Sequence, residues 1–337
     1  MQNGGDNQAL SVLLTGTGSI ARRHANNLRT LRPDVRLFFV VSSANALAWV
    51  NGFGGEAVAS VEAGLQSQPQ LAVVCSSSAS HASDLALLMP QVEALYIEKP
   101  VVTDDDGLRL LQRALAGGWS RPSVVGCNLR YLSVLDKVKQ ALQTGVVGRP
   151  CSASLRVGQW LPEWRQGRDW RRSYSADRSR GGGVIFDLVH ELDSACNLFG
   201  EIAYGQAAAA SLSSLDIAAD DSAAIVLMMK SGLPVQVAMD YVSRVAVREY
   251  TVVGDQATLR LDLIGRQLTV TGPQSNSVVE TAGSDWDMEG TYCLAMQDLL
   301  DSWAEGRPTR FGLVDSMHTT RWMLLLERNA WRGAAFS

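Results

Sequence analysis

The apolar residues of the first 127 positions gather in short, nearly continuous runs separated by segments with helical spacing. The runs cover residues 9–14, 36–41, 71–75, 95–97 and 123–127, and helical spacing covers 20–31, 44–53, 79–89 and 104–115. A strand buried on both faces is apolar throughout, and strands that alternate with helices form right-handed βαβ units. The pattern therefore predicts an α/β domain over residues 1–127, built on a doubly wound parallel sheet.

From residue 128 onward, apolar and polar residues mostly alternate within short runs. These runs cover 152–157, 222–229, 234–241, 248–253, 257–263 and 267–270, and several end in hairpin-like turns. A period of two predicts half-buried strands of an antiparallel sheet. Helical spacing over 135–142, 184–199, 291–305 and 313–329 supplies helices for one face of that sheet. We therefore expect a second, α+β domain over residues 128–337.

Composition and charge narrow the classes of partner. The chain has 337 residues, 46% hydrophobic and 19% charged, and a net charge of −4. This balance gives no reason to expect nucleic acid or an acidic membrane surface as a partner. No apolar run approaches the ~20 residues of a membrane span, and the first residues lack the features of a signal peptide. The five cysteines have no CxxC spacing, which indicates reduced thiols in a cytoplasmic protein and no metal site.

A glycine turn follows the first predicted strand. Its spacing, Gly16-x-Gly18-x-x-Ala21, matches the dinucleotide-binding fingerprint, in which the glycines allow a tight turn and close approach of a pyrophosphate. Free N–H groups at the start of the next helix, at Ser19 and Ile20, favour the phosphate charge. An ordinary strand-to-helix turn remains the alternative, because the pattern alone is weak.

The residues that follow the other predicted strands extend this candidate cofactor site, because ligands of doubly wound sheets gather at the carboxyl ends of strands. An acidic residue after the second strand would bind the ribose 2′-hydroxyl of NAD. Ser42 and Ser43 stand there instead, and Arg22 follows the glycine turn. These residues favour NADP over NAD, although turn serines and a solvent-facing arginine are also ordinary. The remaining candidate cofactor contacts are Ser76, Ser77, His81, Glu98 and Lys99.

Two further motifs carry candidate chemistry. Glu98-Lys99-Pro100 follows a predicted strand, so that Lys99 would lie near the nicotinamide of a dinucleotide bound at the glycine turn. Asp187 and His190 follow a run of three glycines and, three residues apart, would share one face of the predicted helix 184–199. A carboxylate and an imidazole are suited to proton transfer. A solvated lysine and an incidental polar helix face are the alternatives.

The loop upstream of this helix has the most distinctive local composition. Residues 159–174 contain three tryptophans and four arginines. Aromatic rings suit the faces of sugars, and guanidinium groups suit phosphates or carboxylates. The loop therefore favours an anionic sugar as substrate, with Arg165, Arg168 and Tyr174 as candidate ligands. Packing between domains or subunits is the alternative.

In their order and spacing, these motifs resemble the glucose-fructose oxidoreductase/inositol dehydrogenase (Gfo/Idh/MocA) family across almost the whole chain. The segment Gly126-Cys127-Asn128-Leu129-Arg130-Tyr131 adds to the resemblance. It implies an N-terminal Rossmann domain and a C-terminal domain with a large, open, mostly antiparallel sheet. It also implies that Lys99 polarises the substrate oxygen, that His190 is the general acid/base, and that Asp187 binds substrate or assists proton transfer. Many members have the aspartate and histidine four residues apart, which leaves the role of Asp187 less secure here.

The leading hypothesis is an NAD(P)-dependent oxidoreductase that acts on a hydroxyl-bearing carbon of a sugar, such as a nucleotide or acidic sugar of surface-polysaccharide biosynthesis. Lys99, Arg130, Arg165, Arg168, Tyr174, Asp187 and His190 are the candidate substrate ligands. The alternatives are a glycoside hydrolase that keeps its NAD bound, and a non-catalytic dinucleotide sensor on the same fold. A sensor needs no proton-transfer pair, so Lys99 and His190 argue against it. The resemblance also implies a homodimer or homotetramer.

Overall fold

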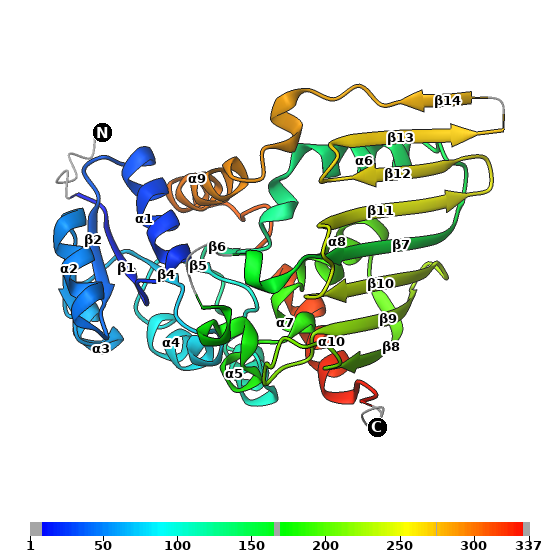
Figure 1. Cartoon of the computed structure of the whole chain (residues 1–337). Coiled ribbons are helices and arrows are strands. Elements are labelled where there is room, and N and C mark those ends of the chain that lie inside the picture. The colour runs from blue at the N-terminus through cyan, green and yellow to red at the C-terminus, as the bar shows by residue number, and fades with distance from the viewer. Residues whose placement is uncertain (1–8, 165–168, 274, 333–337) are drawn as a thin grey trace, which may run out of the picture. The chain divides into compact units, whose positions relative to one another are not determined.

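The computed structural model of the chain describes residues 9–164, 169–273 and 275–332. The chain divides into two compact units (Figure 1). Residues up to Gly126 and the segment Tyr292–Ser316 form the first unit, and Cys127–Thr291 and the residues from Met317 onward form the second. The first boundary lies beside the expected one at residue 127, whereas Tyr292–Ser316 was expected in the second domain.

The first unit is built on a parallel sheet, as the apolar runs predicted. In the described part of this unit, six strands pair in the order β3-β2-β1-β4-β5-β6. The order reverses between β1 and β4, which is the doubly wound arrangement. The strands are β1 (Ser11–Leu14), β2 (Arg36–Val40), β3 (Glu56–Val58), β4 (Leu71–Val74), β5 (Ala94–Ile97) and β6 (Ser123–Val125).

The helices of this unit begin where polar residues cap them. Ser43 and Ser60 each accept a backbone N–H bond at the start of their helix, and Asp104 does the same for the last one. Such caps satisfy N–H groups that lack a partner in the first turn. The helices are α1 (Ser19–Leu31), α2 (Ala44–Phe53), α3 (Val61–Leu65), α4 (His81–Leu88) and α5 (Asp105–Ala116). Sequence reasoning missed β3 and α3, which are too short for a periodic pattern.

The second unit contains the predicted sheet, in which a single parallel pair, β7 with β10, lies among antiparallel neighbours along its described strands. The order is β14-β13-β12-β11-β7-β10-β9-β8. The fold class expected from the sequence is therefore confirmed. The strands are β7 (Pro150–Gly158), β8 (Ile202–Ala210), β9 (Ser222–Met229), β10 (Pro234–Asp240), β11 (Val247–Gly254), β12 (Thr258–Asp262), β13 (Gln267–Gly272) and β14 (Ser275–Val278).

One prediction about the helices is wrong. The single helix expected over residues 184–199 is two helices, α7 (Val184–Asp187) and α8 (His190–Phe199). The backbone leaves helical geometry at Leu188, where φ is −99° and ψ is 26°. Asp187 and His190 therefore end one helix and begin the next, and do not share a face of one helix. The other helices are α6 (Ser133–Gln143), α9 (Gly290–Glu305) and α10 (Leu313–Asn329).

None of the helices that the structure describes is both long enough and apolar enough to cross a bilayer. Helix α8 packs on the large sheet, where it contacts β7 and β10 (Figure 1).

A buried ion pair fixes α8 on this sheet. Glu191, at the second position of α8, has no solvent exposure, and its Oε1 accepts a bond from Nε of Arg248 at 2.6 Å. The hydroxyl of Tyr250 lies 3.3 Å from the same oxygen and 3.1 Å from Oγ of Ser194. Because a buried charge without its partner is costly, this pair fixes where α8, and with it His190, stands on β11.

We predict that Glu191→Ala lowers the free energy of unfolding by about 3–5 kcal/mol, because it leaves the Arg248 guanidinium buried without its carboxylate. Urea denaturation followed by circular dichroism measures the loss. Glu201→Ala is the matched control: it breaks an ion pair with Lys230 in which both side chains are more than half exposed, so it should change stability little. Equal effects of the two substitutions would contradict the prediction.

Candidate functional site

The glycine turn of the first unit has the geometry of a phosphate-binding turn. A side chain at Gly16 would meet the backbone of Cys75, 2.8 Å from its carbonyl oxygen, so the turn lies tightly against the end of β4. A side chain at Gly18 would meet no atom within 4 Å, so the space there is open. Gly18 begins α1 without a side-chain cap, and the first turn of α1 has no acidic residue. The N–H groups of Ser19 and Ile20 are thus available to an anion.

At the end of β2, one candidate cofactor residue is exposed, and the others bond groups of the same unit. Ser42 is exposed, and Oγ of Ser43 accepts a bond from the backbone N–H of Ala46 as the cap of α2. The Arg22 side chain donates to the Thr17 carbonyl, and its guanidinium lies 4.4 Å from the centre of the Trp49 ring. No acidic residue stands at this strand end.

The candidates after β4 bond within the unit. Ser76 Oγ donates to Asp84 at 2.7 Å, and Ser77 and Ser80 share a hydroxyl–hydroxyl bond at 3.0 Å. His81 is buried, with its Nδ1 2.9 Å from the carbonyl oxygen of Pro100. A carbonyl can only accept, so Nδ1 carries the proton. Burial lowers the pKa of His81, so the ring stays neutral. The neutral ring supports the Lys99-Pro100 turn through its bond to the Pro100 carbonyl.

Glu98 has a buried partner that the sequence analysis missed. Its Oε1 lies 2.7 Å from Nε2 of His24, and its Oε2 accepts the backbone N–H of Lys99 at 3.3 Å. His24 is fully buried on α1, in the apolar stripe formed with Ala21 and Leu28. A polar residue inside such a stripe is the signal that could have revealed the pair. Lys99 is half-buried directly beyond β5, at the carboxyl edge of the sheet where the sequence predicted it.

In the second unit, the structure joins Tyr174 and Asp187. The buried Asp187 carboxylate accepts three hydroxyl bonds: from Tyr174 at 2.6 Å, from Ser175 at 2.7 Å and from Tyr241 at 3.2 Å. Burial and the negative charge of Asp187 raise the pKa of Tyr241, so that phenol stays protonated and donates. His190, at the start of α8, is half-buried.

Arg130 has partners within the same unit. Its guanidinium donates to both oxygens of Asp193, at 2.8 and 2.9 Å, and to Asn197 at 3.3 Å. Both partners belong to α8. The arrangement is a bidentate ion pair that ties the start of the second unit to α8, and as a substrate ligand Arg130 stays a prediction.

In the tryptophan- and arginine-rich segment, the candidate substrate ligands Arg165 and Arg168 lie outside the described residues. Arginine side chains already lie over two of its tryptophan rings. The guanidinium of Arg244 lies 3.5 Å from the centre of the Trp160 ring, and that of Arg171 lies 3.9 Å from the centre of the Trp170 ring. The third, Trp164, meets Tyr241 edge to face. A sugar that stacks on the covered faces would have to displace these guanidinium groups.

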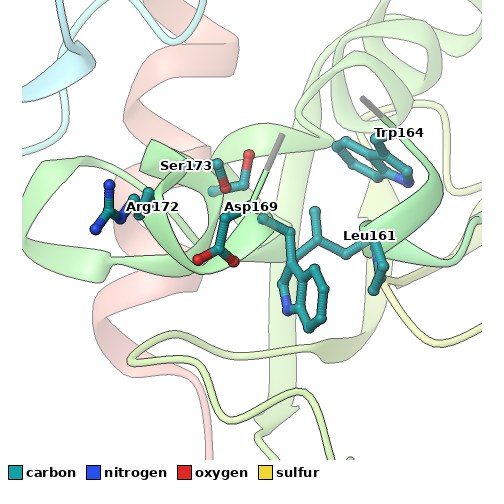
Figure 2. Close-up of a pocket in the computed structure, with 8 residues that line it drawn as sticks. Leu161, Trp164, Asp169, Arg172 and Ser173 are labelled. Atoms are coloured by element: carbon teal, nitrogen blue, oxygen red, sulfur yellow. The ribbon is translucent and has the colours of Figure 1, made fainter. Parts of the chain in front are cut away.

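A cavity of about 320 Å³ lies in this segment (Figure 2). In the view of Figure 2, Leu161 and Trp164 lie on one side, and Asp169, Arg172 and Ser173 lie on the other. The remaining lining residues are Pro162, Trp170 and Ser175. Since Ser175 also bonds Asp187, the cavity adjoins the buried carboxylate.

Two family models match the chain. "Oxidoreductase family, NAD-binding Rossmann fold" matches residues 10–117, and "GFO/IDH/MocA C-terminal domain" matches residues 135–260. No curated protein matches the chain.

Solved structures share the fold over nearly the whole chain. An oxidoreductase from Agrobacterium radiobacter, in complex with NAD+, L-tartaric acid and magnesium, is 18% identical with a TM-score of 0.80, covering 95% of this chain and 96% of its own. Levoglucosan dehydrogenase in complex with NADH is 16% identical with a TM-score of 0.82, covering 96% and 97%. UDP-N-acetylglucosamine 3-dehydrogenase from Acidithiobacillus ferrooxidans is 18% identical with a TM-score of 0.76, covering 96% and 98%. The matches to both parts of the chain confirm the resemblance: the chain belongs to the Gfo/Idh/MocA family of NAD-binding oxidoreductases.

Proposed function

We propose that this protein is an NAD(P)-dependent dehydrogenase or reductase that acts on a hydroxyl-bearing carbon of an anionic sugar derivative, such as a nucleotide or acidic sugar. The observation that carries the proposal is Lys99, which follows β5 at the carboxyl edge of the dinucleotide-binding sheet. A protein that only senses the dinucleotide needs no ammonium group there. Levoglucosan dehydrogenase and UDP-N-acetylglucosamine 3-dehydrogenase, which share the fold, support a sugar as the substrate class.

The residues of the first unit fit a dinucleotide. The open space at Gly18 and the uncapped start of α1 would hold the pyrophosphate,. When bound, the nicotinamide accepts or delivers the hydride. In this proposal the Lys99 ammonium polarises the substrate oxygen, and the His190 imidazole takes or returns the hydroxyl proton.

The three hydroxyl bonds to Asp187 favour a different role for this residue. A carboxylate whose two oxygens already accept bonds from Tyr174, Ser175 and Tyr241 is poorly placed to receive a proton from substrate. We infer that Asp187 orients the Tyr174 hydroxyl and provides a fixed negative charge near the end of α7. Tyr174, which is partly exposed, is then the member of this group that meets the substrate.

The chain's residues after β2 favour NADP. Ser42 is exposed at the position where an acidic residue would bind the NAD ribose, and no carboxylate there repels a 2′-phosphate,. Arg22 is anchored in the same unit by its contact with Trp49 of α2.

We also infer self-association through the outward face of the large sheet. Apolar side chains are exposed there on β8, β9 and β11: Tyr204, Val226, Met228 and Val253. Exposed apolar patches of this kind mark interaction surfaces. Sedimentation analysis should therefore give a dimer or tetramer, and substitution of Val226 and Met228 by lysine should shift it to the monomer. A wild-type monomer at micromolar concentration would contradict this inference.

We predict that Lys99→Ala and His190→Gln each lower kcat by at least about 100-fold, because general acid–base groups contribute roughly 10²–10⁴-fold. The change in nicotinamide absorbance with a panel of hexoses, uronic acids and nucleotide sugars measures the activity. Lys139→Ala, which removes an exposed lysine of α6, is the matched control and should leave kcat unchanged. Binding of NAD(P) without turnover of any sugar would favour a sensor, and release of a glycoside product without net reduction would favour the hydrolase.

We predict that Ser42→Asp lowers the affinity for NADP relative to NAD by about tenfold or more, because the new carboxylate repels the 2′-phosphate. Titration followed by nicotinamide fluorescence measures both affinities. Ser42→Ala is the control and should leave the ratio within about threefold of the wild type, a difference well below 1 kcal/mol. An equal loss of affinity for both cofactors would show that Ser42 does not face the ribose.

A further inference from the structure

Two arginines and two acidic residues form a cluster that joins the residues after α10 to the segment that carries Tyr174. The Arg332 guanidinium donates to both carboxylate oxygens of Asp220, at 2.7 Å in the shortest bond, and to Oε1 of Glu327 at 2.9 Å. The guanidinium of Arg178 pairs with the same two carboxylates. Each carboxylate side chain is only 13% exposed, so solvent screens the cluster less than it screens a surface ion pair.

The residues after α10 are fixed at the edge of the large sheet. The Trp331 N–H donates to the Ala207 carbonyl at 2.9 Å, and its carbonyl accepts the N–H of Ala209 at 3.0 Å. Trp331 thereby pairs with β8, the last strand in the order of the sheet (Figure 1). Arg332, the next residue, is held beside a strand whose position is set by the sheet, so it offers a fixed point for the segment that carries Tyr174.

The loop between β8 and β9, which contains Asp220, connects this fixed point to the segment. The backbone carbonyl of Asp220 accepts the N–H of Val184, the first residue of α7, at 3.2 Å. Two residues earlier, Ala218 donates to the Ala176 carbonyl at 2.9 Å and accepts the N–H of Arg178 at 3.1 Å. The loop therefore bonds the segment on both sides of its three glycines.

Apolar burial contributes little to holding the segment in place. Residues 170–183 contain short 3-10 turns, in which Ser175 and Ala176 are the buried residues. Few buried apolar contacts give a region low local stability, so the position of Tyr174 depends on polar bonds. Asp187 supplies such bonds to Tyr174 and Ser175, and the charged cluster supplies them farther along the segment.

We propose that Arg332 is a positioning residue, which acts through Asp220 to fix the segment that presents Tyr174 to the substrate. The contact of Tyr174 with substrate rests on the proposed function, whereas the coupling of Arg332 to the segment belongs to the folded chain and is testable without substrate. Lys99 and His190 lie on other elements. Loss of the Arg332 bonds should therefore weaken sugar binding and leave the chemical step largely unchanged.

Hydrogen–deuterium exchange of the full chain, followed by mass spectrometry, tests the coupling. In Arg332→Ala, the amides of residues 174–184 and 211–221 should exchange about tenfold or more faster than in the wild type, because opening the segment no longer breaks charged bonds. Arg332→Lys keeps the charge but loses the fork, and should restore part of the protection. Arg36→Ala is the matched control: it breaks an ion pair of the first unit in which both side chains are more than half exposed, and should leave this exchange unchanged.

A double variant tests the route through Asp220. If Arg332 acts through this carboxylate, adding Arg332→Ala to Asp220→Asn should raise the exchange of residues 174–184 by less than about threefold beyond Asp220→Asn alone. Effects that multiply in full would show two independent contacts and would overturn the proposed route.

Melting temperature and kinetics separate positioning from general stability. The melting temperature of Arg332→Ala should stay within about 4 °C of the wild type. For a sugar that the wild type oxidises, KM should rise about tenfold while kcat stays within about threefold. Faster exchange throughout the second unit, unchanged exchange of residues 174–184, or a fall in kcat at constant KM would overturn the proposal.

The two measurements also distinguish this inference from the proposed function. Faster exchange confined to the segment and its loop, without oxidation of any sugar by the wild type, supports the coupling and contradicts the proposed function. Oxidation of sugars by the wild type, with the same exchange in wild type and Arg332→Ala, does the reverse.

Discussion

The irregular segment before α7 depends on the buried negative charge of Asp187. Asp187 ends α7, and its carboxylate is held by hydroxyl groups from the irregular segment before the helix and from Tyr241 beyond β10. A buried carboxylate requires such donors, because burial without them is far more costly than the bonds are favourable. The same bonds give a segment without long helices or strands a fixed place beside the sheet. Tyr174 and Ser175 of this segment thus owe their positions to the buried carboxylate of Asp187.

Two neighbouring acidic residues of α8 complete this arrangement. Glu191 bonds Arg248 of β11, and Asp193 bonds Arg130 near the start of the unit. His190, which directly precedes Glu191 in the sequence, is partly exposed. Helices α7 and α8 therefore combine carboxylates that bond within the unit with an imidazole that is partly exposed. The break at Leu188 makes this possible, because it lets the two helices point their polar residues independently.

Both sheets could be predicted from the sequence, because buried parallel strands and half-buried antiparallel strands leave distinct periodic patterns. Two strands could not be predicted: β3, an edge strand of three residues, and β8, in which alanines replace the usual β-branched residues. The position of Lys99 followed from the strand before it. The bonds to Asp187 did not follow, because Tyr241 is 54 residues away and only the folded chain brings the two together. The pairing of His24 with Glu98, 74 residues apart, was hidden for the same reason.

The acidic residues of α7 and α8 show that charges which are conspicuous in a sequence can serve the fold. The carboxylates of Asp187, Glu191 and Asp193 are conspicuous in the sequence, yet each is bonded by donors of the same unit. All three carboxylates are buried, and a buried carboxylate without donors would cost more stability than its bonds return. Two of the donors, Arg130 and Arg248, lie 63 and 57 residues from their carboxylates in the sequence. A charge that the sequence marks as a candidate for chemistry is therefore assigned to the fold only when the folded chain shows its partners.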